Sequence, residues 1–161
     1  DTALSLRAKI GEAVVPLMRR NLSAAVSGGL NFQPQDASGV THCRKITKAD
    51  GAFDVTLPAV QISARLRAFS PWPGAYFEFS GERIKAGLCH SLEEAASALP
   101  GTLLPRAEDG YLRIACGKGV LVVCELQRPG GRMLPAADFL RGYPLDAGLV
   151  LQSVPGRPLV D

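Results

Sequence analysis

The spacing of hydrophobic positions changes along the chain, and the first part has the spacing of a helix. Thr2 is a suitable N-cap, Pro16 is expected to kink or break the helix near its middle, and Gly28 with Gly29 is expected to end it. Apolar side chains recur at near-helical intervals through residues 1–27, at Leu4, Ala8, Ile10, Val14, Leu17, Met18 and Leu22. One helix cannot bury so many apolar side chains by itself. We therefore expect it either to belong to another domain or to pack back on the rest of the chain.

A second, shorter helical pattern follows Pro58 and leads into a stiff corner. We expect Thr56 to be its N-cap and Ser70 to end it, because the residue before a proline is disfavoured in the α region. Its apolar stripe is predicted at Ile62, Leu66 and Phe69. Residues 71–74 read Pro-Trp-Pro-Gly, and two prolines fix the backbone there. We expect Trp72 to be mostly buried, wedged between this helix and the strand that follows.

An alternating pattern dominates the second half of the chain and predicts short strands separated by glycine turns. The predicted strands cover residues 75–79, 83–89, 101–106, 111–116, 120–126 and 148–152. Two short segments interrupt them, a helix or loop at residues 90–98 and a helix from Pro135 to Gly142. Five or six short strands with small helices predict a mainly β fold. We expect an OB-like barrel, preceded by the N-terminal helix and a linker.

The linker is predicted at residues 30–46, which have no apolar period and are rich in Asn, Gln, Pro, Asp, Ser and Gly. Directly after it, Thr47 and Asp50 have the spacing of a capping box, which predicts one turn of helix. The chain thus divides into a helix, an irregular connection and a strand-rich domain.

Composition narrows the classes of function. The chain has 161 residues, of which 47% are hydrophobic, so it is long enough for one domain, or for one domain plus a piece of another. Its apolar runs are too short for a membrane span, and its start lacks the pattern of a signal peptide. Because it does not begin with Met, we expect Asp1 to mark a fragment boundary. The net charge of +3 permits contact with a polyanion without requiring it.

Residues that could carry chemistry are sparse. The four cysteines have no CxxC spacing and the two histidines, His42 and His90, lie far apart, so we expect no metal site. We expect buried free thiols, typical of a reducing cytoplasm, at Cys89, Cys116 and Cys124. The sequence has no glycine-rich phosphate loop, no HExxH and no GxSxG. We therefore expect no catalytic residue in this chain.

Four stretches resemble, in the same order, the C-terminal domain of the methionyl-tRNA formyltransferase family. They are residues 33–54, 65–86, 100–123 and 126–142, and the last of them contains PAADFLRG. The resemblance implies the same OB-like fold and a division of the chain. Residues 1–29 would be the last helix of an otherwise absent catalytic domain, residues 30–46 the linker, and residues 47–161 the barrel domain.

The resemblance also implies an activity for the parent protein. In that family, an Asn, a His and an Asp of the N-terminal domain move a formyl group from 10-formyltetrahydrofolate to the amine of methionyl-initiator tRNA. This chain lacks the Asn/His motif, and Asp1-Thr2 lacks the glycine of the family's aspartate motif. The chain alone is thus expected to be inactive and to bind no cofactor. Its expected partners are the acceptor arm of the tRNA and the catalytic domain, in a monomeric cytoplasmic enzyme that binds no membrane.

Basic residues after the linker are the candidate tRNA contacts. The resemblance implies phosphate contacts at Arg44, Lys45 and Lys48, and a short segment of flexible cations suits an RNA backbone. Arg132 and Arg141 flank the last helix and could extend this surface. An ordinary solvated surface would contain the same residues. Two other functions also stay open: a structural barrel in a sugar- or folate-directed formyltransferase, and a stand-alone RNA-binding barrel.

Overall fold

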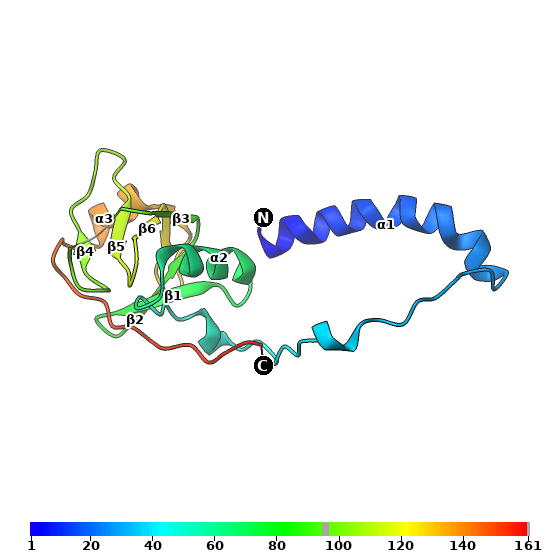
Figure 1. Cartoon of the computed structure of the whole chain (residues 1–161). Coiled ribbons are helices and arrows are strands. Elements are labelled where there is room, and N and C mark those ends of the chain that lie inside the picture. The colour runs from blue at the N-terminus through cyan, green and yellow to red at the C-terminus, as the bar shows by residue number, and fades with distance from the viewer. Residues whose placement is uncertain (95–96, 161) are drawn as a thin grey trace.

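The computed structural model describes residues 1–94 and 97–160. Within these residues, the strands and two α-helices form one body, and the first helix, α1 (Ala3–Val26), approaches it near its N-terminal end and projects away from it along the rest of its length (Figure 1). The segment after α1 runs back to this body and meets the C-terminal tail there, where Cys43 and Val160 form an isolated β-bridge (Figure 1). We call the body, residues 47–160, the β domain.

The first antiparallel sheet has the strand order β1-β2-β7-β8. Its strands are β1 (Ala75–Phe79), β2 (Glu82–Ala86), β7 (Glu125–Gln127) and β8 (Leu134–Pro135). A tight turn joins β1 to β2, with Gly81 at a φ of 79°, a conformation that favours glycine. The register places Phe77 opposite Ile84, and both side chains are buried. The predicted hairpin is therefore confirmed, but its second strand, predicted at residues 83–89, ends at Ala86, and Cys89 belongs to a strand of the other sheet.

The second antiparallel sheet has the order β3-β6-β5-β4. Its strands are β3 (Cys89–Leu92), β6 (Val120–Val123), β5 (Leu112–Ala115) and β4 (Leu103–Leu104). The chain passes between the sheets at two adjacent points, after β2 and after β6. At the second point only Cys124 separates β6 from β7, and its N–H donates to the Leu88 carbonyl over 2.8 Å. The single strand predicted at residues 120–126 is thus divided at Cys124.

Both sheets contribute to one hydrophobic core, which confirms the prediction of a mainly β fold. Its side chains come from strands of each sheet and from two helices, α2 (Ala59–Phe69) and α3 (Ala136–Gly142). The core includes Phe77, Ile84, Leu112, Ile114, Leu121, Val123, Leu126, Ile62, Leu66, Phe139 and Leu140. As expected, Cys89, Cys116 and Cys124 are buried free thiols, whereas Cys43 is exposed.

Helix α2 buries its predicted stripe, but it begins two residues later than Thr56 would require. Ile62, Leu66 and Phe69 are each at most 5% exposed. The N-cap is Pro58, and the Thr56 hydroxyl instead donates to the Asp54 carboxylate. The prediction of Thr56 as N-cap is therefore wrong, because the Asp54 carboxylate takes up its side chain.

The corner after α2 leaves its tryptophan in solvent. Trp72 is 56% exposed, so the prediction that it is mostly buried is wrong. The core positions at this corner are filled by the residues on either side of it, Phe69 at 2% and Ala75 at 5% exposed. Gly74 has a φ of 80° and its N–H donates to the Phe69 carbonyl, so it turns the chain directly into β1.

Helix α1 forms as predicted at both ends. Thr2 caps it, with a capping box to Ser5, and Gly28 follows it at a φ of 73°. The helix continues through Pro16, so the predicted interruption does not divide it. No residue of α1, all of which the structure describes, is buried. Its exposed apolar side chains include Leu6, Ile10, Val14, Leu17 and Leu22.

Three further predicted elements differ in the structure. Residues 89–92 form a strand on β6, so they are not part of a helix at residues 90–98, and residues 95–96 of that prediction lie outside the described residues. The strand predicted at 101–106 is limited to β4, because Pro105 has no N–H for the ladder. Residues 148–152 form only an isolated bridge between Val150 and Thr102. The alternation of apolar and polar side chains does not specify which residues form the hydrogen bonds between strands, so it did not predict these bounds.

Candidate nucleic-acid interface

The basic segment after the linker is organised around the buried carboxylate of Asp50. Arg44 donates to it from two guanidinium nitrogens, and one of these bonds, Nη1 to Oδ2, measures 2.9 Å. The Thr47 N–H donates to Oδ2 over 2.7 Å, which confirms the predicted capping box at η2 (Lys48–Gly51). Arg65 of α2 donates to the Asp50 backbone carbonyl over 3.1 Å. A residue before the domain, a turn and a helix thus meet at one acidic residue.

Arg44 also holds the C-terminal tail. Its Nε donates to the Pro158 carbonyl over 2.9 Å, and its backbone N–H donates to the Leu159 carbonyl over 3.0 Å. These two contacts join the end of the linker to the far end of the chain. The guanidinium of Arg44 therefore binds groups of the protein itself, and its side chain stays 31% exposed.

The charge on Asp50 is stabilised by its surroundings. The hydrogen bonds from Arg44 are the main cause that holds the pKa of the Asp50 carboxyl well below its ordinary value, and the hydrogen bond from the Thr47 N–H is the second. Burial of the carboxyl opposes this shift. Asp50 is 5% exposed, so its negative charge is available to Arg44 and Arg65 but hardly to solvent. The Asp50 carboxylate therefore neutralises positive charge of the arginines beside it. Because it is buried and paired, it repels an anion at the surface only weakly.

Lys45 and Lys48 carry the positive charges of the segment that are exposed and outside the described ion pairs. Both side chains are exposed, and no carboxylate of residues 1–94 or 97–160 forms an ion pair with either of them. They lie on either side of the Thr47 cap, in backbone that the Asp50 contacts fix. Of the three basic residues predicted here, these two are thus exposed and without an ion pair in the described part of the chain.

The other two predicted contacts, Arg132 and Arg141, lie at α3. Arg141 is exposed and forms an ion pair with Asp138 one turn earlier. Arg132 is exposed and lines a cavity of about 360 Å³ beside the helix. The structure therefore places both residues at one helix, as predicted from the sequence.

A third basic residue at this cavity was missed by sequence reasoning. Arg128 lies with its guanidinium carbon 4.8 Å from the centroid of the Tyr143 ring, and it forms a 3.0 Å ion pair with Glu82. The hydrogen bond to Glu82 raises the pKa of Arg128, a side chain that is charged at neutral pH in any case. The three residues come from segments far apart in the sequence, and no local pattern links them.

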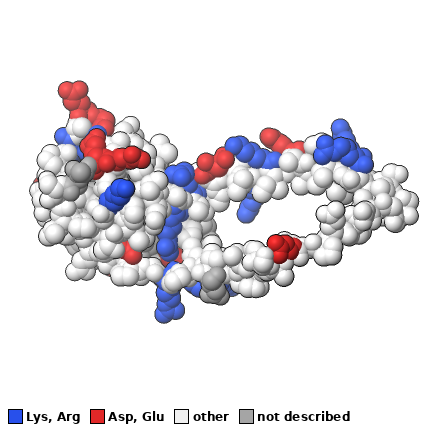
Figure 2. Space-filling model, viewed as in Figure 1, with Lys and Arg blue, Asp and Glu red and all other residues white. Residues whose placement is uncertain are grey.

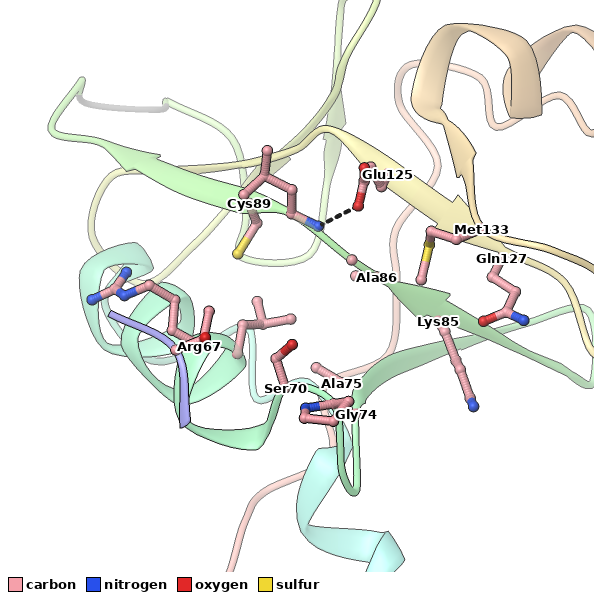
Figure 3. Close-up of a pocket in the computed structure, with 15 residues that line it drawn as sticks. Arg67, Ser70, Gly74, Ala75, Lys85, Ala86, Cys89, Glu125, Gln127 and Met133 are labelled. Atoms are coloured by element: carbon pink, nitrogen blue, oxygen red, sulfur yellow. Dashed lines mark hydrogen bonds between the residues drawn. The ribbon is translucent and has the colours of Figure 1, made fainter. Parts of the chain in front are cut away.

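A second cavity, of about 450 Å³, lies between α2 and the first sheet (Figure 3). Polar side chains of its wall include Arg67, Ser70, Lys85, Glu125 and Gln127, and Met133 and other side chains supply apolar surface (Figure 3). Glu125 accepts the Leu88 N–H over 3.1 Å, drawn as a dashed line in Figure 3, so this carboxylate is already engaged.

The thiol in the same cavity is not activated. Burial raises the pKa of Cys89 to about 11, despite a hydrogen bond with Ser63. A thiol with this pKa is protonated at neutral pH and is a poor nucleophile. Burial likewise raises the pKa of Cys116 to about 11. Neither cysteine has the properties of a catalytic nucleophile.

The charge distribution of the surface is uneven. On the face drawn in Figure 2, blue Lys and Arg side chains form a column at the edge of the β domain that faces α1 and the linker. Red Asp and Glu side chains gather at the far end of the domain from α1 (Figure 2). An anionic partner would thus be attracted to the side of the domain from which the linker leaves.

Metal-binding clusters and membrane-spanning helices are absent from the described residues. Among residues 1–94 and 97–160, no cluster of three or more His, Cys, Asp or Glu side chains could hold a metal ion. Within the same residues, α1 is the longest helix, and neither it nor another helix is both long and apolar enough to cross a membrane. The features that remain are exposed cations, arginines that lie over aromatic rings, and the two cavities described above.

Comparison with known proteins identifies the domain. Residues 45–144 match the family model described as formyl transferase, C-terminal domain. The matched range begins at Lys45 and ends just after Tyr143, so it contains the β domain up to the end of α3. Most of the chain therefore lies inside one family model.

Longer matches include α1 and the linker. A methionyl-tRNA formyltransferase from Delftia acidovorans is 42% identical over 153 residues, which cover 94% of this chain and 46% of that protein. One from Myxococcus xanthus is 39% identical over 148 residues, covering 92% of this chain and 46% of its own length. The chain spans about half the length of the curated relatives it matches.

Solved structures share the fold. HypX from Aquifex aeolicus superposes with a TM-score of 0.57 at 19% identity, over 81% of this chain and 23% of that one. A crystal structure of HypX in complex with tetrahydrofolic acid gives a TM-score of 0.56 at 17% identity, over 88% and 27% of the two chains. At this level of identity the likeness concerns the fold alone.

Proposed function

Because the chain belongs to the formyl transferase C-terminal domain family, we propose that it is the tRNA-binding C-terminal portion of a methionyl-tRNA formyltransferase. The observation that carries this proposal is the extent of the similarity. Relatives with that name match at about 40% identity from α1 to the tail, beyond the limits of the domain shared by formyltransferases in general. The whole protein would transfer a formyl group from 10-formyltetrahydrofolate to the amine of methionyl-initiator tRNA.

The proposed division of labour assigns the chemistry to another part of the protein. Residues 1–29 would be the last helix of the catalytic domain, residues 30–46 the linker, and residues 47–161 the tRNA-binding domain. The exposed apolar side chains of α1 support this division, because packing against another domain would bury them. In this proposal 10-formyltetrahydrofolate binds to the catalytic domain, and the chain alone is inactive.

The two sheets would together form an OB-like barrel. The support is that they share one core and that the chain crosses from one to the other at neighbouring points, after β2 and after β6. The crossing strands are tied by the bond from the Cys124 N–H to the Leu88 carbonyl. OB folds commonly bind oligonucleotides, but the fold by itself does not establish a function.

The contacts to tRNA are proposed to be with phosphates of the acceptor arm. Lys45 and Lys48 would make them directly, because they are exposed and the turn that carries them is fixed by Asp50. Arg44 would position this segment, and Arg132 and Arg141 would extend the basic surface at α3. Phosphate contacts do not distinguish one tRNA from another, so selection of the initiator would come from the catalytic domain. We propose a monomeric, cytoplasmic enzyme without a membrane contact.

A binding titration tests this function. The 161-residue chain is titrated into fluorescently labelled initiator tRNA at several salt concentrations. We expect weak binding, with log affinity falling linearly against log salt by about 0.9 for each phosphate neutralised. A chain that does not bind tRNA even at low salt would refute the proposed tRNA-binding role. Retention of the same affinity in high salt would refute phosphate contacts.

A further inference from the structure

Arg128 and Tyr143 form a flat, charged surface at the end of the first sheet. Arg128 directly follows β7, and Tyr143 directly follows α3. The guanidinium carbon lies 4.8 Å from the ring centroid, a distance typical of stacking between arginine and an aromatic ring. The ion pair with Glu82 at 3.0 Å fixes the rotation of the guanidinium in this position. The plane of the arginine is therefore set from two sides.

The ring beneath it is equally well held. Tyr143 packs against Phe139 with centroids 5.5 Å apart and meets Phe79 edge to face at 6.0 Å. These neighbours belong to α3 and β1, so the ring is anchored in both a helix and a sheet. A stacking surface that is already ordered loses little conformational entropy when a ligand binds.

The outer face of the arginine stays open. Half of the Arg128 side chain is exposed although one face covers Tyr143. Next to it lies the cavity of about 360 Å³, whose walls include Phe139, Leu134 and Arg132. A volume of this size accommodates a small planar ligand. Arg132 at the rim supplies a second, exposed cation, while the Asp138 carboxylate is neutralised by Arg141.

These features match the chemistry of an unpaired nucleotide. Arginine planes and aromatic rings stack on bases that are not in a duplex, and a neighbouring cation can bind the adjoining phosphate. We propose that Arg128, held on Tyr143, is a stacking platform for an unpaired nucleobase of the bound RNA, with Arg132 on the neighbouring phosphate. This inference rests on the proposed RNA-binding function and adds to it a contact that depends on a base as well as on charge.

The chain contains a matched control. Arg83 lies 4.8 Å from the centroid of the Tyr76 ring and pairs with Glu78 at 3.1 Å, so it has the same kinds of partner as Arg128. Its side chain is 60% exposed, close to the 50% of Arg128, but it does not line the cavity at α3. Arg128→Lys changes an arginine at the cavity, and Arg83→Lys makes the same chemical change away from it. Both variants keep the positive charge.

The test compares three RNAs with the wild-type chain and these two variants. The RNAs are a blunt duplex, the same duplex with a short adenosine overhang, and the same overhang built from abasic nucleotides. We expect the wild type to bind the adenosine overhang about fivefold more tightly than the abasic one, which has the same phosphates. Arg128→Lys should remove this difference, whereas Arg83→Lys should keep it. All three proteins should bind the blunt duplex equally.

Each contrary result has a separate meaning. If the wild type binds adenosine and abasic overhangs equally, the platform is refuted while the RNA-binding function stands. An equal effect of Arg83→Lys and Arg128→Lys also refutes it, because the cavity then has no role. If the wild type binds none of the RNAs, both the platform and the proposed function are refuted. The comparison of RNAs on the wild type requires no variant to fold.

Discussion

Asp50 accepts hydrogen bonds from two nitrogens of the Arg44 guanidinium, and Arg44 in turn holds the C-terminal tail. This pair joins the end of the linker to the first turn of the β domain. It explains how a chain without regular structure just before residue 47 can present Lys45 and Lys48 in a fixed position. We infer that Arg44 orders the basic segment, and that the two lysines supply its accessible charge.

Replacing Asp50 by Asn should destabilise the β domain. The change keeps the shape of the side chain but removes the charge that Arg44 and the Thr47 N–H bind. We expect a loss of about 1.5–3 kcal/mol in the free energy of unfolding, the range for hydrogen bonds to charged groups. Urea denaturation measures it. Asp36→Asn is the control, because Asp36 also caps a short 3-10 helix but is exposed, and it should change stability much less. Equal effects would refute a special role for Asp50.

Asp50 should also contribute to the loss of stability in acid. Its pKa in the folded chain is lowered, mainly by the hydrogen bond from Arg44, whereas in the unfolded chain it is about 4. Its contribution is therefore fully present above about pH 4 and disappears as the pH falls from there toward the folded value. We expect the melting temperature of the wild type to fall more steeply than that of Asp50→Asn between about pH 5 and about pH 3, on either side of the unfolded pKa. Parallel curves would contradict this.

Removing both free lysines should weaken tRNA binding without unfolding the domain. We expect Lys45→Ala with Lys48→Ala to reduce the salt slope of binding by about two, roughly one for each phosphate that is no longer neutralised. The melting temperature should stay the same, because no carboxylate of the described residues pairs with either lysine. The control is Arg106→Ala with Lys118→Ala, two other exposed cations. If the lysine pair keeps the wild-type slope, the tRNA contacts lie elsewhere, and Arg132 with Arg141 would be tested next.

The two aromatic residues at the corner after α2 should differ in their effect on stability. Trp72 is 56% exposed, so Trp72→Ala is expected to cost less than about 1 kcal/mol. Phe69 is 2% exposed, and Phe69→Ala should cost about 3–5 kcal/mol because it leaves a cavity in the core. Thermal or urea unfolding of both variants gives the comparison. A larger cost for Trp72 would mean that its ring is covered in solution.

Local sequence patterns were sufficient to predict elements that are defined by neighbouring residues, such as helix caps and the apolar stripe of a helix. The cap at Thr2, the stripe from Ile62 to Phe69 and the capping box of Thr47 with Asp50 all follow from spacing and side-chain chemistry, and the structure confirms them. Trp72 shows the limit of this reasoning. Its size favours burial, but whether a ring at a corner faces the core depends on how its neighbours pack, which is a tertiary property.

The candidate site was only partly visible in the sequence for the same reason. The cluster of Arg44, Lys45 and Lys48 is local, so it could be recognised as basic, but the carboxylate that occupies Arg44 was identified only as a cap. Arg128 has partners at Glu82 and Tyr143, which the sheet order and α3 bring to it. Contacts between distant segments follow from strand order and register, and neither can be read from hydrophobic alternation alone.

If this chain is the C-terminal portion of a methionyl-tRNA formyltransferase, as we propose, a chimera that contains it should formylate methionyl-tRNA. The part of the Delftia acidovorans relative that precedes its match to this chain is joined to residues 1–161. Formylation of methionyl-initiator tRNA is then measured with 10-formyltetrahydrofolate, beside the complete relative and its N-terminal part alone. We expect the chimera to formylate tRNA far faster than the N-terminal part alone. A folded chimera that is no faster than that part, while the complete relative is active, would contradict the proposed function.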